Sequence, residues 1–430
     1  MKQTILNGRL GGPLAVIPSK SASHRAVLMA ALAQGETILE PLQLSHDISA
    51  TLDCIQQLGY TRGLSTVPTA VPGYIRASIL GRAPASSVSN SRILDCGESG
   101  STLRFLIPLA LDGRGPVRFV GRGRLMQRPL TIYEDIAREQ NFFWQLRGNE
   151  LSVEGRLKAG TYSLPGNISS QFITGLLLAL PLLSEDSAII LTTPLESRGY
   201  VDLTRHIQAM FGIQTIWEDD RLLIPGRQVP RSPRQVQVES DWSHAAFYLV
   251  AGTFGSAPIT LYGLDLNSPQ GDKVILDILT QMGADIDATQ ERIIVTPSPL
   301  HAIEADVSQC PDLVPVLAVA MAAAHGESRI TGAARLRLKE SDRLRAVASM
   351  LQSYKSICYE QDDGLIIRGG LSLRGAEIDG WNDHRIVMAA AIASGLCSDP
   401  VTISDAEAVT KSAPAFWDEF KRLGGILDER

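Results

Sequence analysis

Cationic and hydroxyl side chains recur in this sequence at the points where an apolar, helix-like run begins. The segments SKSASHR, GESGSTLR, SSQF and NDHR each precede or open such a run. A helix start offers free backbone N–H groups and a partial positive charge, and both attract anions. Arginine adds paired, charge-assisted hydrogen bonds to a phosphate or a carboxylate. The pattern therefore indicates a site for small, multiply anionic substrates that carry phosphate.

These residues form two sets according to the helix they precede. In or before the apolar runs lie Lys20, Ser21, Arg25, Gly100, Ser101, Arg104, Ser169, Ser170, Gln171, His384 and Arg385. Around a second, amphipathic helix lie Arg128, Ser197, Lys339, Arg343 and Lys411. An arginine in a first helical turn opposes the helix dipole, so its recurrence there favours a function.

Each of these residues also has an ordinary structural explanation. A serine before a helix is usually an N-cap, which is how Ser23 and Ser243 are interpreted when each is taken alone. Asp312 and Asp383 are also candidate caps, and the run Lys339–Arg343 has the composition of a solvated turn. The functional interpretation rests on the recurrence of such residues at one phase of a repeat.

The repeat consists of a polar cluster, an apolar helix-like run, a short turn and an apolar strand. Its copies begin at Ser23, Ser99, Ser169, Ser243, Asp312 and Asp383, so the period is about 72 residues and the copies tile the chain. Each copy continues with an amphipathic helix, and four of these run into a glycine that suits a helix C-cap: Gly59, Gly212, Gly283 and Gly424. Several copies close with a hairpin, such as those predicted to turn at Gly148-Asn149 and Asp219-Asp220.

The repeat predicts an α/β fold in which each copy reads helix, strand, helix, strand, strand. The first helices are apolar nearly all round and should be buried, whereas the second helices have one polar face. Six copies exceed one core, so two groups of three should form two domains of about 200 residues each. If the copies pack in like orientation, the helix starts converge on one rim of each domain, and two facing rims make a cationic cleft.

Bulk properties exclude several classes of protein. The 430 residues are 44% hydrophobic and 20% charged, as in a globular protein, and the net charge of −6 argues against nucleic acid as the main partner. Five scattered cysteines indicate neither a disulfide framework nor a zinc site and suit a reducing compartment. The N-terminus lacks a signal-peptide core, and no apolar run is long enough to span a bilayer.

No other chemical motif competes with the anion site. The sequence has no GxGxxG after a strand, no GxxxxGK[ST] and no HExxH. Its seven histidines show no metal-ligand spacing.

The chain resembles the EPSP synthases, the 3-phosphoshikimate 1-carboxyvinyltransferases. SKSASHR, GESGSTLR, QRP, SSQF, SRGY, LKESDR, NDHR and VTKSAP occur in the family's order, from Lys20 to beyond Lys411. The resemblance implies two inside-out α/β domains of three βαβαββ units each, with the active site in the interdomain cleft. It places residues 1–18 and 240–430 in one domain and 19–239 in the other, and it implies closure of the two domains around the substrates.

The implied reaction transfers the enolpyruvyl group of phosphoenolpyruvate to the 5-hydroxyl of shikimate 3-phosphate and releases phosphate. This is a step of aromatic amino acid biosynthesis and requires no metal or organic cofactor. The resemblance also implies a cytoplasmic monomer without nucleic-acid or membrane partners.

The resemblance assigns roles residue by residue. Asp312 would be the base for the 5-hydroxyl, Glu340 the proton carrier at carbon 3, and Lys20 a third catalytic residue. Phosphoenolpyruvate would contact Lys20, Gly100, Arg128, Gln171, Arg343, Arg385 and Lys411. Shikimate 3-phosphate would contact Lys20, Ser21, Arg25, Ser169, Ser170, Gln171, Ser197, Tyr200, Asp312 and Lys339.

The sequence departs from the family's usual motifs at three places. Ile17-Pro18 stands where Pro-Gly is common before the first motif, Arg335 stands where asparagine is common, and Phe105 replaces a common proline behind Gly100. In the family, glyphosate occupies the phosphoenolpyruvate pocket and a methyl group at the Gly100 position crowds it. Gly100 therefore predicts sensitivity to glyphosate, although Phe105 could shift its helix.

Three alternative functions fit the same scaffold or a related repeat. The related transferase that acts on UDP-N-acetylglucosamine typically has a cysteine in the loop that corresponds to GRGRLMQRP, and this loop has none. A non-catalytic protein that binds phosphorylated metabolites would not need the carboxylates Asp312 and Glu340. An RNA-terminal phosphate enzyme would need a more basic surface.

Overall fold

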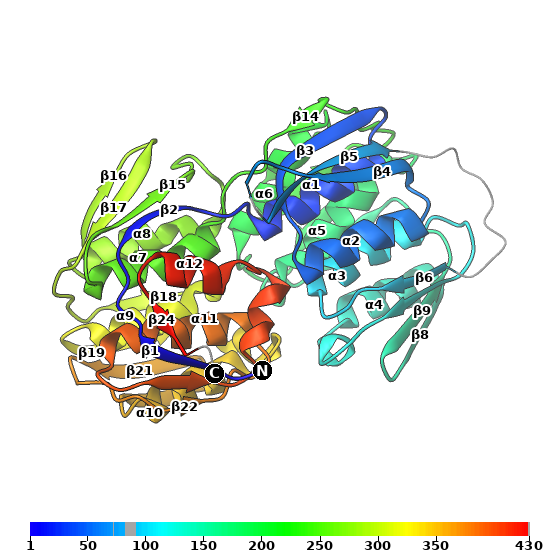
Figure 1. The fold of residues 1–430 in the computed structure, drawn as a ribbon. Helices are drawn as coiled ribbons and strands as arrows, with labels where there is room; N and C mark the ends of the chain where they lie inside the picture. The colour runs from blue at the N-terminus through cyan, green and yellow to red at the C-terminus, as the bar shows by residue number, and fades with distance from the viewer. Residues whose placement is uncertain (72, 82–91, 429–430) are drawn as a thin grey trace. The chain divides into compact units, whose positions relative to one another are not determined.

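The computed structural model describes residues 1–71, 73–81 and 92–428 and consists of helices and short sheets (Figure 1). The chain divides into two compact units, one of Met1–Ser19 with Glu239–Arg430 and the other of Lys20–Val238. In the described ranges each unit contains three four-stranded sheets. Each sheet joins one parallel strand pair to antiparallel partners, as a βαβαββ repeat requires.

The Lys20–Val238 unit contains three copies of the repeat. Its sheets, in spatial order, are β14 (Gln235–Val236), β3 (Glu36–Gln43), β5 (Tyr74–Gly81) and β4 (Thr61–Pro68); β6 (Arg92–Asp95), β7 (Val117–Val120), β9 (Glu150–Glu154) and β8 (Phe143–Arg147); and β10 (Thr161–Leu164), β11 (Ser187–Leu191), β13 (Arg221–Ile224) and β12 (Ile216–Glu218). The first helices are α1 (Lys20–Leu32), α3 (Gly100–Ala110) and α5 (Ser170–Ala179). The second helices are α2 (His46–Gln57), α4 (Thr131–Gln140) and α6 (Arg198–Met210).

The unit of Met1–Ser19 and Glu239–Arg430 has the same organisation. Its sheets are β22 (Glu377–Ile378), β23 (Val401–Ile403), β1 (Gln3–Asn7) and β24 (Ile426–Leu427); β16 (Asp285–Ala288), β17 (Arg292–Thr296), β15 (Ile259–Tyr262) and β2 (Gly12–Ala15); and β18 (Glu304–Asp306), β19 (Gly326–Thr331), β21 (Gly364–Gly369) and β20 (Ile357–Gln361). The first helices are α7 (Trp242–Phe254), α9 (Val314–Ala323) and α11 (His384–Ala393). The second helices are α8 (Ile275–Gln281), α10 (Arg343–Ser353) and α12 (Phe416–Arg422).

The first helix of every copy is buried almost along its whole length, as its apolar sequence predicts. Their close packing requires a glycine in α5, because a Cβ on Gly175 would lie 2.4 Å from the carbonyl oxygen of Arg104 in α3. The sheets therefore surround helices at the centre of each unit, an arrangement that confirms the predicted inside-out α/β fold.

The second helices are amphipathic and end as the sequence predicts. Ile48, Leu52 and Ile55 of α2 are buried, whereas His46 and Asp53 are exposed. Every second helix is followed by a residue with positive φ, where glycine is favoured because it has no Cβ. These residues are Gly59, Asn141, Gly212, Gly283, Lys355 and Gly424.

The first strand of the chain completes a sheet formed by its last residues. β1 pairs with β23 and with β24, both antiparallel, so residues 3–7 lie between segments that follow residue 400. The amide of Asp428 extends this pairing by donating to the carbonyl oxygen of Thr4 at 2.9 Å. β2 pairs in parallel with β15 of the same unit.

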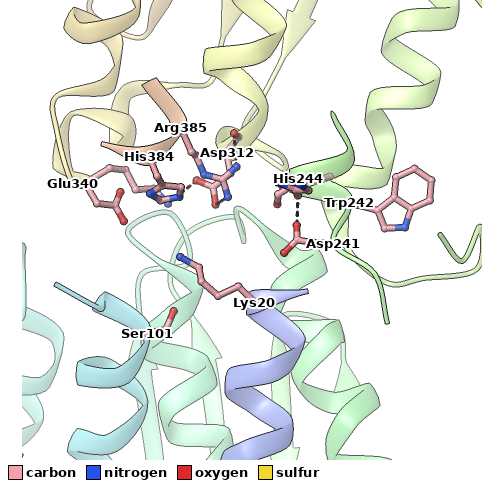
Figure 2. Close-up of polar contacts among 12 residues, drawn as sticks. Lys20, Ser101, Asp241, Trp242, His244, Asp312, Glu340, His384 and Arg385 are labelled. Carbon is pink, nitrogen blue, oxygen red and sulfur yellow. Dashed lines mark hydrogen bonds and ion pairs between the residues drawn. The ribbon is translucent and has the colours of Figure 1, made fainter. Parts of the chain in front are cut away.

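Two predicted serine N-caps are wrong. Ser23 lies inside α1, which begins at Lys20, and Ser243 lies inside α7, whose N-cap is Asp241. The Asp241 carboxylate accepts from the His244 amide at 2.9 Å (Figure 2). The helices begin earlier than their apolar runs because the first turn carries polar residues, and hydrophobic periodicity does not detect such a turn.

Candidate active site

Lys20 and Asp47 form an ion pair at the starts of two helices in the Lys20–Val238 unit. Lys20 is the first residue of α1, and its Nζ lies 2.9 Å from Oδ2 of Asp47, the second residue of α2. The lysine side chain is 20% exposed and the aspartate 14%, so the pair is partly open to an incoming ligand. Asp47 did not emerge from the sequence, because a single carboxylate in a first helical turn is ordinary.

Arg25 is held one helical turn further along α1. Its Nε donates to the hydroxyl of Thr204 at 2.8 Å, and its Nη1 donates to the carbonyl oxygen of Ser21 at 2.7 Å. Its Nη2 donates to the carbonyl oxygen of Tyr200 at 3.1 Å, and its guanidinium lies over the Phe105 ring. This buried arginine therefore ties α1 to α3 and α6, and burial lowers its pKa to about 10.

Gly100 opens α3 against the guanidinium of Arg128. A Cβ at Gly100 would lie 2.7 Å from Nη1 of Arg128 and 3.0 Å from its Cζ. Arg128, which is 8% exposed, follows a short 3-10 helix (Leu125–Gln127) and precedes α4. The missing side chain of Gly100 thus lets an arginine reach the start of a helix, where both favour an anion.

Gln171 is oriented by Arg104. The guanidinium of Arg104 donates to Oε1 of Gln171 at 2.6 Å, which identifies the other end of the amide as its NH2 group. That NH2 group donates to the Ser101 hydroxyl at 3.0 Å. Arg104 also donates to the carbonyl oxygen of Pro129, directly after Arg128, at 3.0 Å.

The serines predicted as ligands occupy two helix starts in the same unit. Ser169 is the N-cap of α5 and accepts from the amide of Gln171 at 3.3 Å, and Ser170 is buried beside it. Ser197 precedes α6 with a φ of 54°, a left-handed conformation that is uncommon for serine. Tyr200 lies in the first turn of α6, and its amide donates to the carbonyl oxygen of Ser197 at 3.1 Å.

In the other unit, three cations surround the carboxylate of Asp312. Arg343 Nη1 lies 2.9 Å from Oδ1, Lys339 Nζ lies 3.3 Å from the same oxygen, and Arg385 Nη2 lies 3.2 Å from Oδ2. Arg385 also donates to the carbonyl oxygen of Asp312 at 3.0 Å, and Figure 2 shows its side chain pointing toward that residue. Asp312 lies in a 3-10 turn (Pro311–Leu313) before α9 and does not cap that helix.

Arg343 is the central cation of this cluster. It is 1% exposed and contacts Glu340 and Asp383 in addition to Asp312. Asp383, which is fully buried, caps α11 by accepting from the Arg385 amide at 3.0 Å and receives Arg343 Nε at 2.8 Å. The predicted cap is therefore confirmed, but its carboxylate also holds the arginine.

Two lysines complete this unit's candidate site. Burial lowers the pKa of Lys339 to about 8, with Asp312 opposing and Arg343 adding to the shift. Lys411 ends a 3-10 helix (Ala406–Lys411) before α12, and its Nζ donates to the carbonyl oxygen of Asn382 at 2.6 Å. Arg335 donates to the carbonyl oxygen of Ser308.

The predicted residues therefore lie at helix starts in both units. Lys20, Ser21, Arg25, Gly100, Arg128, Ser169, Ser170, Gln171, Ser197 and Tyr200 belong to one unit, and Asp312, Lys339, Glu340, Arg343, Arg385 and Lys411 belong to the other. A separate cavity of about 1210 Å³ opens at the opposite ends of α1, α3 and α5, where Leu32, Leu111 and Ala179 line it. No predicted ligand residue lines that cavity.

Comparison with solved structures defines the class of protein. EPSP synthase from Acinetobacter baumannii superposes with a TM-score of 0.79 at 28% identity, and each chain covers 100% of the other. The enolpyruvyl transferase NikO from Streptomyces tendae has the same fold, with a TM-score of 0.78 at 15% identity over 99% of this chain and 98% of that one. The fold is that of the enolpyruvyl transferases.

Comparison of sequences then identifies the family. The family model for EPSP synthase (3-phosphoshikimate 1-carboxyvinyltransferase) matches residues 6–420. The enzyme of that name from Clostridium novyi is 43% identical, with 99% of this chain and 98% of the relative aligned. The one from Clostridium kluyveri is 41% identical over 100% and 99%. This chain belongs to the EPSP synthase family.

Proposed function

We propose that this enzyme transfers the enolpyruvyl group of phosphoenolpyruvate to the 5-hydroxyl of shikimate 3-phosphate and releases phosphate. The observation that carries the proposal is the carboxylate of Asp312, which three cations hold within 3.3 Å at a helix start. Such a site can bind anionic substrates and place a base beside them. Family membership over nearly the whole chain supplies the identity of the substrates.

The two units would supply different groups to the substrates. Lys20, Gly100, Arg128 and Gln171 would bind phosphoenolpyruvate from one unit, and Arg343, Arg385 and Lys411 from the other. The ring and phosphate of shikimate 3-phosphate would contact Lys20, Ser21, Arg25, Ser169, Ser170, Gln171, Ser197, Tyr200, Asp312 and Lys339. A phosphate monoester carries about −1.5 to −2 charges at neutral pH, which suits this excess of cations.

Substrate anions would compete with Asp312 and Glu340 for the cations that now hold them. Once Arg343 and Arg385 bind phosphoenolpyruvate instead, Asp312 can accept the proton of the 5-hydroxyl. Glu340, which takes up a proton from solvent when Arg343 leaves it, can then protonate carbon 3. The oxygen then attacks carbon 2, and the tetrahedral intermediate loses phosphate together with a proton from carbon 3. Glu340 takes the carbon 3 proton back, and the proton on Asp312 leaves with the phosphate, which the cations stabilise. Phosphate is then the only co-product.

The test is phosphate release from phosphoenolpyruvate with and without shikimate 3-phosphate, and separately with UDP-N-acetylglucosamine. Release that requires shikimate 3-phosphate supports the proposal. Release only with the sugar nucleotide would assign the related transferase activity. Binding of either ligand without release would indicate a binding protein.

The lowered pKa of Lys339 predicts that kcat/KM for shikimate 3-phosphate depends on pH. Its pKa of about 8 means that the ammonium loses its proton as the pH rises through 8, and binding of an anion weakens with it. We expect kcat/KM for shikimate 3-phosphate to fall above pH 8. In Lys339→Arg this decline should move to higher pH, because arginine stays protonated there. An unchanged decline in the variant would assign the titration to another group.

Gly100→Ala is expected to weaken phosphoenolpyruvate binding selectively. The new Cβ would displace the Arg128 guanidinium, which lies 2.7 Å from it. We expect the KM for phosphoenolpyruvate to rise about tenfold, since misplacement of a binding group by about 1 Å can cost up to a hundredfold. The KM for shikimate 3-phosphate, measured in parallel, should stay within about twofold. Equal increases in both constants would contradict a local effect on Arg128.

Sensitivity to glyphosate remains a prediction for the enzyme with glycine at position 100. Phe105 is fully buried and packs edge-to-face with His24 at 6.4 Å between ring centroids, so it fills the interior behind α3.

The described part of the chain has no helix long and apolar enough to cross a membrane. A monomeric state and a cytoplasmic location remain predictions.

A further inference from the structure

Two pairs of buried threonines join helices of the Lys20–Val238 unit. Thr51 of α2 lies against Thr102 of α3 with 2.7 Å between the hydroxyl oxygens, and Thr174 of α5 lies against Thr204 of α6 at 2.9 Å. All four residues are completely buried. A hydroxyl that loses its partner there cannot turn to water, so these contacts fix the helices in relation to one another.

The first pair leads to Lys20 on one side. The hydroxyls of Thr51 and Thr102 both contact the carbonyl oxygen of Asp47, at 3.2 and 3.4 Å. The Asp47 carboxylate holds the Lys20 ammonium at 2.9 Å. The threonines therefore fix the backbone of the residue that orients Lys20.

The same pair leads to Gly100 on its other side. Thr102 contacts the Ser99 hydroxyl at 2.7 Å, and Ser99 caps α3 by accepting from the Thr102 amide at 3.1 Å. Gly100 follows Ser99 directly and opens α3. The pair thus holds the helix start at which Gly100 and Arg128 meet.

His24 determines the direction of these hydrogen bonds. Its Nδ1 lies 2.8 Å from the Thr51 hydroxyl, whereas its buried Nε2 has no partner among the described residues. Burial, Lys20 and Arg25 lower its pKa, so the ring is neutral. A proton on Nε2 would be an unsatisfied buried donor, and therefore the proton belongs on Nδ1. His24 then donates to Thr51, and the Thr51 hydroxyl is left to donate to Asp47.

The second pair holds Arg25. The Thr204 hydroxyl accepts from Arg25 Nε at 2.8 Å and the Thr174 hydroxyl from Nη2 at 3.3 Å. Thr204 also donates to the carbonyl oxygen of Tyr200 at 2.8 Å, and that oxygen is a further partner of Arg25. The ligand residues that this pair contacts, Arg25 and Tyr200, are therefore all assigned to shikimate 3-phosphate.

We propose that the two pairs are positioning residues for different substrates, Thr102 with Thr51 for the phosphoenolpyruvate side and Thr174 with Thr204 for shikimate 3-phosphate. The inference rests on the proposed function, which assigns Gly100 and Arg25 to different substrates. Thr102 and Thr174 give the clearest separation. Thr102 contacts the Ser99 hydroxyl at 2.7 Å and the Asp47 carbonyl oxygen only at 3.4 Å, whereas Thr51 acts mainly through Asp47 and Lys20, and Lys20 is assigned to both substrates.

The experiment compares Thr102→Val with Thr174→Val, two substitutions that keep side-chain shape and remove one buried hydroxyl each. Thr102→Val should raise the KM for phosphoenolpyruvate about tenfold and leave that for shikimate 3-phosphate within about twofold, and Thr174→Val should do the reverse. The conservative variants Thr102→Ser and Thr174→Ser retain the hydroxyl and should restore both constants. A merely structural role would lower the melting temperature of both valine variants without this crossed pattern, which would overturn the inference.

Two further observations keep the test decisive. The unmodified enzyme is assayed first, and failure of phosphate release there would overturn the proposed function rather than the threonine roles.

If a valine variant does not fold, nitrogen chemical shifts of His24 in the unmodified enzyme test the network directly. A neutral ring with its proton on Nδ1 between pH 6 and about 8 is expected. A proton on Nε2 would reverse the hydrogen bond to Thr51 and overturn its role in holding Asp47.

Discussion

Asp312→Asn should lower kcat by about 10²- to 10⁴-fold, the contribution usual for a positioned acid or base. Asparagine keeps the size of the side chain and one oxygen for Arg343, Lys339 and Arg385, but it cannot accept the proton of the 5-hydroxyl. The loss should therefore appear in kcat more than in the KM for phosphoenolpyruvate. Steady-state phosphate release with both substrates saturating measures it.

Asp379→Asn is the matched control for this variant. Asp379 is an exposed carboxylate of the same unit that accepts the Trp381 amide at 2.8 Å, a role that asparagine can also fill. The kcat of Asp379→Asn should stay within about twofold of that of the unmodified enzyme. A kcat for Asp312→Asn within about tenfold of the unmodified enzyme would make Asp312 an anchor for substrate rather than the base.

Arg343→Met should destabilise the protein by about 3–5 kcal/mol, the usual cost of removing one partner of a buried ion pair. Burial alone would raise the pKa of Asp383, but the charge and the hydrogen bond of Arg343, together with the charge of His384, outweigh burial and lower it. The stabilisation is thus complete above about pH 4, the pKa of an unfolded aspartate, and is lost as the pH falls through the lower folded pKa. Urea unfolding at pH 7 and at successively lower pH values measures the difference.

Two control variants separate this effect from a general loss of charge. Arg118→Ala removes one partner of an exposed ion pair with Glu150, whose side chain is 47% exposed, and should change the unfolding free energy by less than about 1 kcal/mol. Arg343→Met combined with Asp383→Asn removes both charges and keeps a cap for α11, so it should recover part of the loss. A double variant less stable than Arg343→Met alone would contradict this explanation.

The fold could be predicted from the sequence because its period is repeated six times. Each copy places an apolar helix, an amphipathic helix and a hairpin at one phase, and independent signals such as Gly212 and Gly148-Asn149 agree with the register. The starts of helices were less predictable. Ser23 and Ser243 resemble N-caps, but polar first turns extend both helices beyond their apolar residues.

The candidate site could be predicted only in part. Cations at helix starts are visible in the sequence because they oppose the dipole, as with Arg25 and Arg343. The carboxylates that pair with Lys20 and Arg343 are not visible as partners, because Asp47 and Asp383 stand where aspartate is common at any helix start. The role of the buried threonines could not be predicted from the sequence either, since only the packing of α2 against α3 reveals that Thr51 and Thr102 share a hydrogen bond. Long-range contacts such as these depend on tertiary structure and leave no local pattern.

The place of β1 between β23 and β24 has a consequence for how the chain is made. The Lys20–Val238 unit is continuous and can fold as soon as its residues have left the ribosome, whereas residues 3–7 must wait for residues 401–427. At synthesis rates of about 5–20 residues per second, this delay lasts on the order of tens of seconds. During that interval both edges of the first strand are open to other nascent chains and to chaperones.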